Sequence, residues 1–168
     1  NRISPDAMLL LGRLPAMVLT LLLGVAIAWW TRWQFGAAAA LVALFLFALD
    51  PNFIAHGRYV TTDVCVTLFV FLSCAAWAGY LEHGGLKRLA AAGLMLGLAL
   101  ASKFSALFLA GVLPLLYLIH WLFKPARRPL RRFVLAHAAL AVIAMAVVLA
   151  IYAPETVAAF RGGTSDPL

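Results

Sequence analysis

The chain has 168 residues, of which 65% are hydrophobic and only 11% are charged. A soluble domain carries roughly 45–50% apolar residues, so water cannot be the main solvent of this protein. The formal net charge of +7 would suit nucleic-acid binding, but no base-reading module is recognisable in the sequence. Nucleic acid is therefore excluded as a partner. Most of the excess charge sits in one run between two apolar stretches, interpreted as a cytoplasmic loop near anionic headgroups: Lys124, Arg127, Arg128, Arg131 and Arg132.

Uncharged runs alternate with short charged clusters along the chain. A hydrocarbon core of roughly 30 Å is crossed by about 20 helical residues, and most of these runs approach that length. The fourth and fifth runs are together too long for one crossing, so a tight turn is expected at Ala101-Ser102-Lys103. The sequence thus predicts an all-α, polytopic transmembrane helical bundle, a single domain over 1–168, with about six helices near 14–31, 33–49, 64–81, 89–102, 104–123 and 133–154.

Orientation follows from the distribution of basic residues. With the loop 124–132 in the cytoplasm, alternation of the helices places the turns at Arg32 and at 82–88 on the same side, which collects eight of the thirteen Lys and Arg residues. The amino-terminal segment, the loop 50–63, the turn at Lys103 and the carboxy-terminal tail then share the opposite face. We expect a multi-pass protein of the plasma (inner) membrane whose functional face is extracytoplasmic.

The loop 50–63, DPNFIAHGRYVTTD, concentrates ionisable groups at a membrane boundary, where such groups usually have a structural or functional role. Asp50-Pro51 is interpreted as a helix end, because proline disfavours helical geometry at the preceding residue. Asp63 would serve as an N-cap for the helix that follows it. Capping does not account for His56 and Arg58 in the same loop, so a role for Asp63 in chemistry stays open beside the capping interpretation.

Five side chains are candidates for a site on this face: Arg13, His56, Arg58, Asp63 and Lys103. Lys103 either snorkels to the interface or points towards a ligand held between helix ends, and Arg13 either anchors the start of the first helix or binds the same ligand. Cations stabilise the charge that develops on a phosphate leaving group, and a carboxylate can accept a proton or orient a sugar. The set suits a lipid-linked phosphate held beside a reacting hydroxyl group.

Three motifs add a resemblance: Arg13-Leu-Pro, the segment ALDPNFIAHGRYVTTD that ends at Asp63, and GLALASKFS over 97–105. Over residues 6–152 the chain resembles the phospholipid-carrier-dependent glycosyltransferases of family 39, relatives of the protein O-mannosyltransferases and the lipid A aminoarabinose transferases in the GT-C superfamily. The resemblance implies part of a GT-C membrane core. It also implies an inverting transfer of a sugar from a polyprenyl phosphate to a protein, lipid or glycan hydroxyl on the periplasmic or lumenal side.

By this resemblance Asp63 matches the second acidic position of the family, and Arg58 and Lys103 match basic positions on the same face. The principal catalytic acid of such enzymes lies in the first external loop, after a first membrane helix that this chain lacks. We therefore expect a central fragment of a longer enzyme, inactive by itself. The implied partners are the bilayer, the lipid-linked sugar donor and a protein or glycan acceptor; no cofactor is implied with certainty, and a divalent metal stays open.

Two other classes of membrane protein fit part of the pattern. A transporter or flippase-type subunit for a lipid-linked substrate would place ionisable groups at mid-membrane depth, where the predicted helices hold only His137. A purely structural membrane subunit predicts that Asp63, Arg58 and Lys103 face solvent separately and far from one another.

Overall fold

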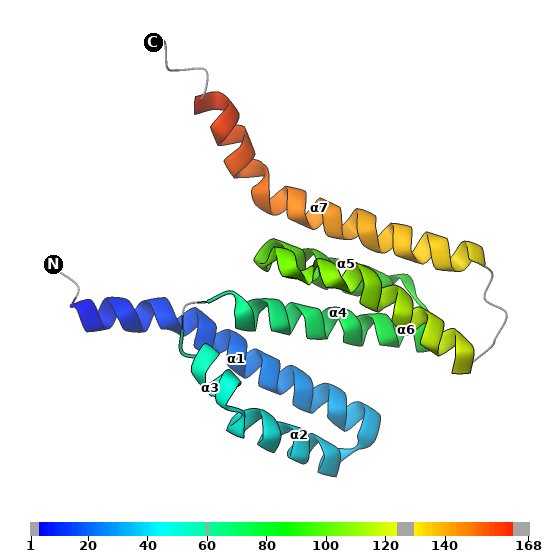
Figure 1. The fold of residues 1–168 in the computed structure, drawn as a ribbon, viewed down its shortest axis with the longest axis horizontal. Helices are drawn as coiled ribbons and strands as arrows, with labels where there is room; N and C mark the ends of the chain where they lie inside the picture. Colours follow the sequence, from blue (N-terminus) through cyan, green and yellow to red (C-terminus); the bar gives the residue numbers. More distant parts are fainter. Residues whose placement is uncertain (1–3, 60, 124–129, 163–168) are drawn as a thin grey trace.

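The computed structural model describes residues 4–59, 61–123 and 130–162. In this part of the chain every regular element is a helix, which confirms the all-α class. The long helices lie roughly side by side and alternate in direction, so the chain passes repeatedly between two ends (Figure 1). The elements are α1 (Pro5–Phe35), α2 (Ala37–Leu49), α3 (Pro51–His56), α4 (Asp63–His83), α5 (Leu86–Ser102), the 3₁₀ helix η1 (Phe104–Phe108), α6 (Leu109–Phe123) and α7 (Leu130–Gly162).

Not every helix is long enough to cross a bilayer. α2 has 13 residues and α5 has 17, fewer than the roughly 20 that a full crossing needs. Among the described residues, four helices meet the length and composition of a membrane span: Ala7–Phe35, Asp63–His83, Phe104–Phe123 and Leu130–Val157. The fold is therefore a polytopic membrane bundle in which two shorter helices pack among four full-length ones.

Helix boundaries differ from the uncharged runs because a single charge does not end a helix. α1 begins at Pro5 instead of near residue 14, with Ser4 as its N-cap: the Ser4 hydroxyl accepts a hydrogen bond from the Ala7 amide at 3.3 Å. The turn expected at Arg32 lies at Gly36 instead, where φ is +88°. Glycine adopts this backbone conformation without a steric cost, whereas Arg32 remains in the last turn of the helix.

The other end of the chain shows similar extensions. α5 begins at Leu86, three residues before the expected 89, and α7 begins at Leu130 and continues beyond the expected 154. α7 contains Pro154, which removes one backbone hydrogen bond, and the helix bends in its carboxy-terminal part (Figure 1). Of the basic run expected to form the cytoplasmic loop, Lys124, Arg127 and Arg128 lie outside the described residues.

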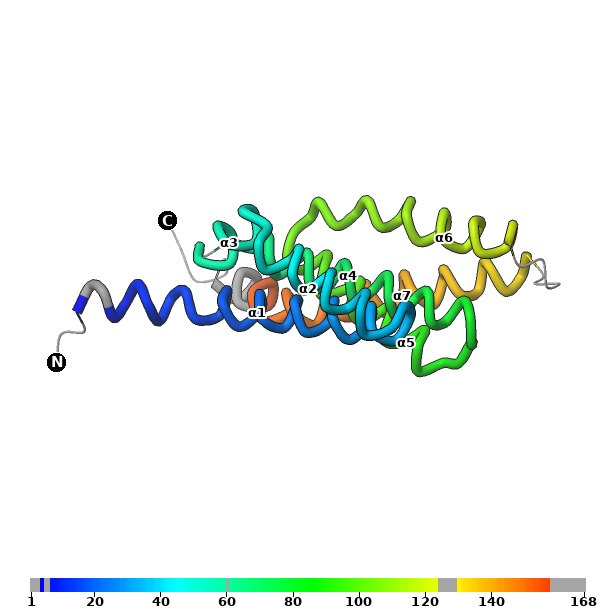
Figure 2. The backbone as a smooth tube through the Cα atoms, turned by 90° about the horizontal axis from the view of Figure 1, so that it is seen from below, coloured from blue at the N-terminus to red at the C-terminus, as the bar shows by residue number. Residues whose placement is uncertain are grey.

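The centre of the bundle is the pair α4 and α5. α7 packs against α5, α1 packs against α4, and α2 packs against α1. α6 runs along the outer side and contacts α4 (Figure 2). The buried side chains that join these elements are mostly Ala, Leu and aromatic residues, and Trp77 of α4 is wholly buried among them.

Close approach of α5 and α7 depends on two glycines. A Cβ atom on Gly93 would lie 2.9 Å from Ile143 Cβ, and one on Gly97 would lie 2.6 Å from Val147 Cβ. Real Cβ atoms do not approach that closely, so only glycine fits at this separation of the helices. Gly93 and Gly97 are four residues apart, a small-xxx-small spacing that lets membrane helices pack closely, and the helix they pack against is α7.

Two side-chain hydrogen bonds also join α4 to its neighbours. The Ser73 hydroxyl donates to the Ala92 carbonyl of α5 at 3.1 Å, and the Trp77 indole N–H donates to the Leu113 carbonyl of α6 at 3.0 Å. Both donors are fully buried. A buried donor that lacked an acceptor in a lipid environment would be costly, so these bonds help to fix the positions of α5 and α6 against α4.

Candidate functional site

An ion pair joins two segments that are 40 residues apart in the chain. Lys103 Nζ lies 2.6 Å from Asp63 Oδ1. Asp63 is the first residue of α4, and Lys103 follows the last residue of α5 with an extended backbone, φ −159° and ψ 129°. The break in the helix expected at residues 101–103 falls at Lys103, whereas Ala101 and Ser102 still belong to α5. It turns the lysine out of the helix, at the end of the bundle where α4 begins.

The second oxygen of the same carboxylate faces an imidazole. His56 Nδ1 lies 3.5 Å from Asp63 Oδ2. His56 is the last residue of α3, a short helix whose start is capped by Asp50: its carboxylate accepts hydrogen bonds from the amides of Asn52, at 2.7 Å, and Phe53, at 3.3 Å. Asp50 therefore ends α2, as Asp50-Pro51 predicted, and also begins the helix that carries His56.

The interpretation of Asp63 as an N-cap is wrong. The N-cap of α4 is Thr62, no side chain makes a capping hydrogen bond there, and Asp63 already lies inside the helix. Its carboxylate turns towards Lys103 and His56 instead. A negative charge in the first turn still interacts favourably with the positive end of the helix dipole.

Residues without charge hold this end of the bundle together. Ser102, which precedes Lys103, has its Oγ 3.2 Å from Cys65 Sγ of α4 and donates to the Leu98 carbonyl at 2.7 Å. The Tyr152 hydroxyl of α7 donates to the Ala101 carbonyl at 3.0 Å. These contacts fix the end of α5 against α4 and α7, and they therefore position Lys103. No sequence pattern indicated this role for Cys65 or Tyr152.

Gly57 packs the loop that carries His56 against α1. A Cβ atom at this position would lie 2.8 Å from both the Phe53 carbonyl oxygen and Thr20 Oγ1. The backbone angles of Gly57, φ −66° and ψ −14°, are ordinary for any residue. Glycine is required here by the close approach of the loop to α1, which the sequence pattern does not reveal.

Two of the five predicted residues stand apart from this ion-pair cluster. Arg58 is exposed in the turn after α3, and Arg13 is exposed within α1, inside a helix and not at its start. Neither side chain forms a hydrogen bond or ion pair with another residue in 4–59, 61–123 or 130–162. Arg58 nevertheless lies only two residues beyond His56 in the chain, so its guanidinium group is at the same end of the bundle. There it is available to a bound ligand.

The arrangement is suited to binding an anion at the membrane boundary. One carboxylate, one ammonium group and one imidazole lie together and are all partly exposed to solvent. No group of three or more His, Cys, Asp or Glu side chains that could hold a metal comes together in the described segments. Asp63 and His56 alone are too few ligands for a structural metal site, so the cluster is interpreted through its own charges and protons.

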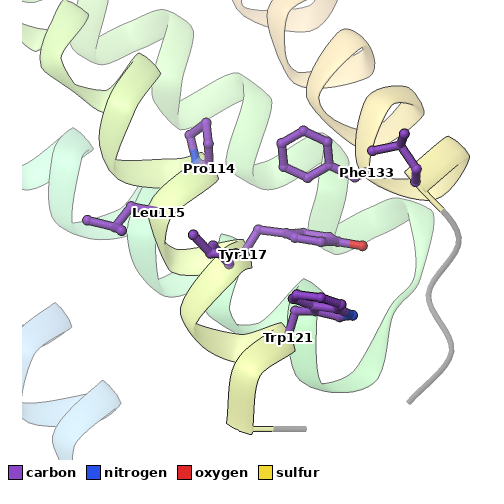
Figure 3. Close-up of a pocket in the computed structure, with 7 residues that line it drawn as sticks. Pro114, Leu115, Tyr117, Trp121 and Phe133 are labelled. Carbon is purple, nitrogen blue, oxygen red and sulfur yellow. The ribbon is translucent and has the colours of Figure 1, made fainter. Parts of the chain in front are cut away.

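An apolar groove lined by aromatic rings lies elsewhere in the bundle. It has a volume of about 570 Å³ between α6 and the start of α7, and it contains none of the five predicted residues. The rings of Tyr117, Trp121 and Phe133 line it (Figure 3). The groove is apolar and lies away from the ion-pair cluster, so it is not the place for the chemistry of Asp63 and Lys103.

Comparison with known proteins gives one match. A family model described as dolichyl-phosphate-mannose-protein mannosyltransferase matches residues 7–152, a range that includes Arg13, His56, Arg58, Asp63 and Lys103. No curated protein and no solved structure matches the chain.

Proposed function

The chain belongs to the dolichyl-phosphate-mannose-protein mannosyltransferase family, and on that premise we propose that it helps to transfer a sugar from a polyprenyl-phosphate donor to a hydroxyl group on the extracytoplasmic side of the membrane. Membership makes it a membrane glycosyltransferase of the mannosyltransferase type. The lipid-linked donor, the protein, lipid or glycan acceptor and the plasma-membrane location are the parts that we propose.

The observation that supports the proposal is the cluster of Asp63, Lys103 and His56. In a transfer of this kind the bond between the sugar C1 and the phosphate oxygen breaks, a bond from C1 to the acceptor oxygen forms, and the acceptor hydroxyl loses its proton. Negative charge builds up on the departing lipid phosphate, and cations beside it stabilise that charge. Lys103 and Arg58 are the cations that we assign to this role, with Arg13 as a further contact to the lipid phosphate.

Asp63 and His56 have complementary parts in the same proposal. Lys103 is held by Asp63 when no donor is bound, and a phosphate would compete for its ammonium group. Once Lys103 turns to the phosphate, the carboxylate of Asp63 becomes available to accept the proton of the acceptor hydroxyl or to orient the sugar. His56, beside the second oxygen of Asp63, would donate a hydrogen bond to the donor or keep the carboxylate in position.

The test is a transfer assay with the product of the complete reading frame in isolated membranes. Polyprenyl-phosphate [³H]mannose serves as donor, and label incorporated into acceptor is counted. We expect Asp63→Asn to lower the transfer rate by about 10²-fold or more, the usual size of a general-base contribution. Glu155→Gln, which removes a carboxylate from exposed Glu155 of α7, is the control and should not change the rate. An unchanged rate in Asp63→Asn would leave Asp63 with a structural role only.

A charge exchange separates chemistry from structure. In the double variant Asp63→Lys/Lys103→Asp the two groups can pair again, so folding and membrane insertion should match the unmodified protein. Transfer should remain lost, because the cation and the carboxylate have changed places relative to donor and acceptor. Recovery of transfer in the exchanged variant would mean that the pair serves only to hold α4 and α5 together, which favours the purely structural alternative.

A further inference from the structure

A second charged site lies at the end of the bundle opposite the Asp63–Lys103 pair. A groove of about 460 Å³ opens where the end of α4, the start of α5 and the start of α7 meet. Arg131 and Arg132 of α7 line this groove and are exposed. Its other walls include the buried Leu89 and Ala136 and the exposed Leu135, so two guanidinium groups lie beside an apolar channel.

The two guanidinium groups lack a partner of opposite charge. Among the described residues, no carboxylate lies within ion-pair distance of Arg131 or Arg132. Glu82 is the only described carboxylate at this end of the bundle, and it lies 4.0 Å from the imidazole of His83. Arg88, a third guanidinium nearby, donates to the Gly84 carbonyl at 3.2 Å. Within the described part of the chain, no carboxylate therefore pairs with Arg131 or Arg132 at this groove.

One of these cations lies over the turn between α4 and α5. A Cβ atom on Gly84 would lie 3.3 Å from Arg132 Nη2, so Arg132 reaches from α7 to the turn. Gly84 and Gly85 have φ angles of +70° and +96°. The absence of a side chain at Gly84 makes room for the guanidinium group. The groove is thus bounded by α4, α5 and α7, with the guanidinium group of Arg132 at the α4–α5 turn.

We propose that this groove binds one anionic phospholipid of the adjacent leaflet. Its phosphate would lie against Arg131 and Arg132, and an acyl chain would follow the apolar wall past Leu89, Leu135 and Ala139. Arginine suits this role because its planar guanidinium binds phosphate through two parallel hydrogen bonds. The lipid phosphate would supply a negatively charged partner for the two arginines, and the lipid would bridge the α4–α5 turn to α7.

Position and shape select the occupant. A free phosphate would use the two arginines but not the apolar wall, and a zwitterionic lipid would leave the excess positive charge uncompensated. The sugar donor of the proposed reaction is assigned to the opposite end of the bundle, so this groove is a separate site. Basic residues near a membrane surface attract anionic lipids in general. The groove adds a defined place for a single molecule.

The test measures the thermal unfolding of the purified full-length protein in a neutral detergent with added lipid. We expect phosphatidylglycerol to raise the unfolding temperature in a saturable way at about one lipid per chain, as a ligand that binds only the folded state does. Phosphatidylcholine and inorganic phosphate should have little effect. Equal stabilisation by phosphatidylcholine would overturn the proposal, and equal stabilisation by inorganic phosphate would reduce the site to an ion site.

Three variants locate the effect. Arg131→Lys/Arg132→Lys keeps the charge that directs membrane topology but removes the guanidinium groups, and we expect the apparent affinity for phosphatidylglycerol to fall about tenfold, which corresponds to the loss of one charge-assisted hydrogen bond. Ala139→Trp fills the channel without changing the charge and should also weaken binding. Lys87→Gln, at the same end but outside the groove, is the control. Unchanged binding in both groove variants would contradict the assignment; if a variant fails to fold, the comparison of lipids on the unmodified protein still decides.

Discussion

One carboxylate oxygen of Asp63 faces Lys103 and the other faces His56. The solvent exposure of the ion pair determines how much it contributes to folding stability. The side chains of Asp63 and Lys103 are 38% and 47% exposed. Ion pairs with this exposure add little to folding stability, because both charges are already well solvated. A contact that contributes little to stability can be given up when a phosphate arrives. We therefore interpret the pair as a resting arrangement of a binding site more than as a brace between α4 and α5.

Gly57 offers a test of how precisely the neighbouring loop must lie. In Gly57→Ala the new methyl group meets the Phe53 carbonyl and Thr20 Oγ1, so the loop must move away from α1 and carry His56 and Arg58 with it. We expect a higher KM for the lipid-linked donor and a destabilisation of about 1–3 kcal/mol from overpacking. Transfer kinetics and unfolding of the same preparation give both values.

The control for that substitution is Gly111→Ala, because a Cβ at Gly111 meets nothing within 4 Å. It should leave KM and stability unchanged. Adding Thr20→Ala to Gly57→Ala removes the clash with Thr20 but leaves the one with the Phe53 carbonyl, so it should recover only part of the lost donor binding. If Gly57→Ala behaves like Gly111→Ala, the close approach of the loop to α1 has no bearing on the site.

At the scale of single elements, α5 shows which features the sequence could predict. The sequence predicts its end near Ser102 and the turn at Lys103, because the fourth and fifth apolar runs together are too long for a single membrane crossing. The contact of Lys103 with Asp63 does not follow, because helix alternation places both residues on one face without fixing their distance. That distance depends on Cys65 and Tyr152, whose contacts arise only when three helices pack.

The turn between α1 and α2 shows the opposite case. A charge at Arg32 interrupts the apolar pattern, and the sequence therefore predicts a turn there. The long side chain of arginine can remain on a helix and reach the headgroup region, whereas Gly36 allows the backbone itself to reverse at φ +88°. The position of this turn depends on the backbone conformation that Gly36 allows, and the pattern of charges does not reveal it.

The packing of α5 against α7 makes a prediction at the same scale. Gly97→Ala should destabilise the protein by about 1–3 kcal/mol, because its methyl group would meet Val147 Cβ and the backbone oxygen of Ala144, at 2.6 and 2.9 Å. Gly79→Ala in α4 is the matched control, since its methyl group would meet only the Arg88 side chain, at an ordinary 3.5 Å from Cδ. Unfolding of both variants by sodium dodecyl sulfate provides the comparison. Equal stability of the two would show that α5 and α7 can separate without cost.

For the whole molecule, two ends of different chemistry follow from the fold. One end holds Asp63, Lys103, His56 and Arg58, where the carboxylate is paired with the ammonium group. The other holds a single described carboxylate, Glu82, and five described basic residues: Arg32, Lys87, Arg88, Arg131 and Arg132. From the excess of basic residues we expect the more basic end to face the cytoplasm. The candidate site for sugar transfer would then face outward, and the proposed phospholipid would belong to the cytoplasmic leaflet.

Accessibility labelling tests this orientation directly. In a background with Cys65 and Cys74 replaced by alanine, single cysteines are placed at the exposed positions Ala55 and Phe104, near the candidate site, and at the exposed Leu86, at the other end. A membrane-impermeant maleimide added to intact cells should label positions 55 and 104, and it should label position 86 only after permeabilisation. Labelling of 55 and 104 from different sides would separate the loop from Lys103 and end the shared-site proposal. Labelling of position 86 alone in intact cells would place the site in the cytoplasm, where the proposed extracytoplasmic transfer could not occur.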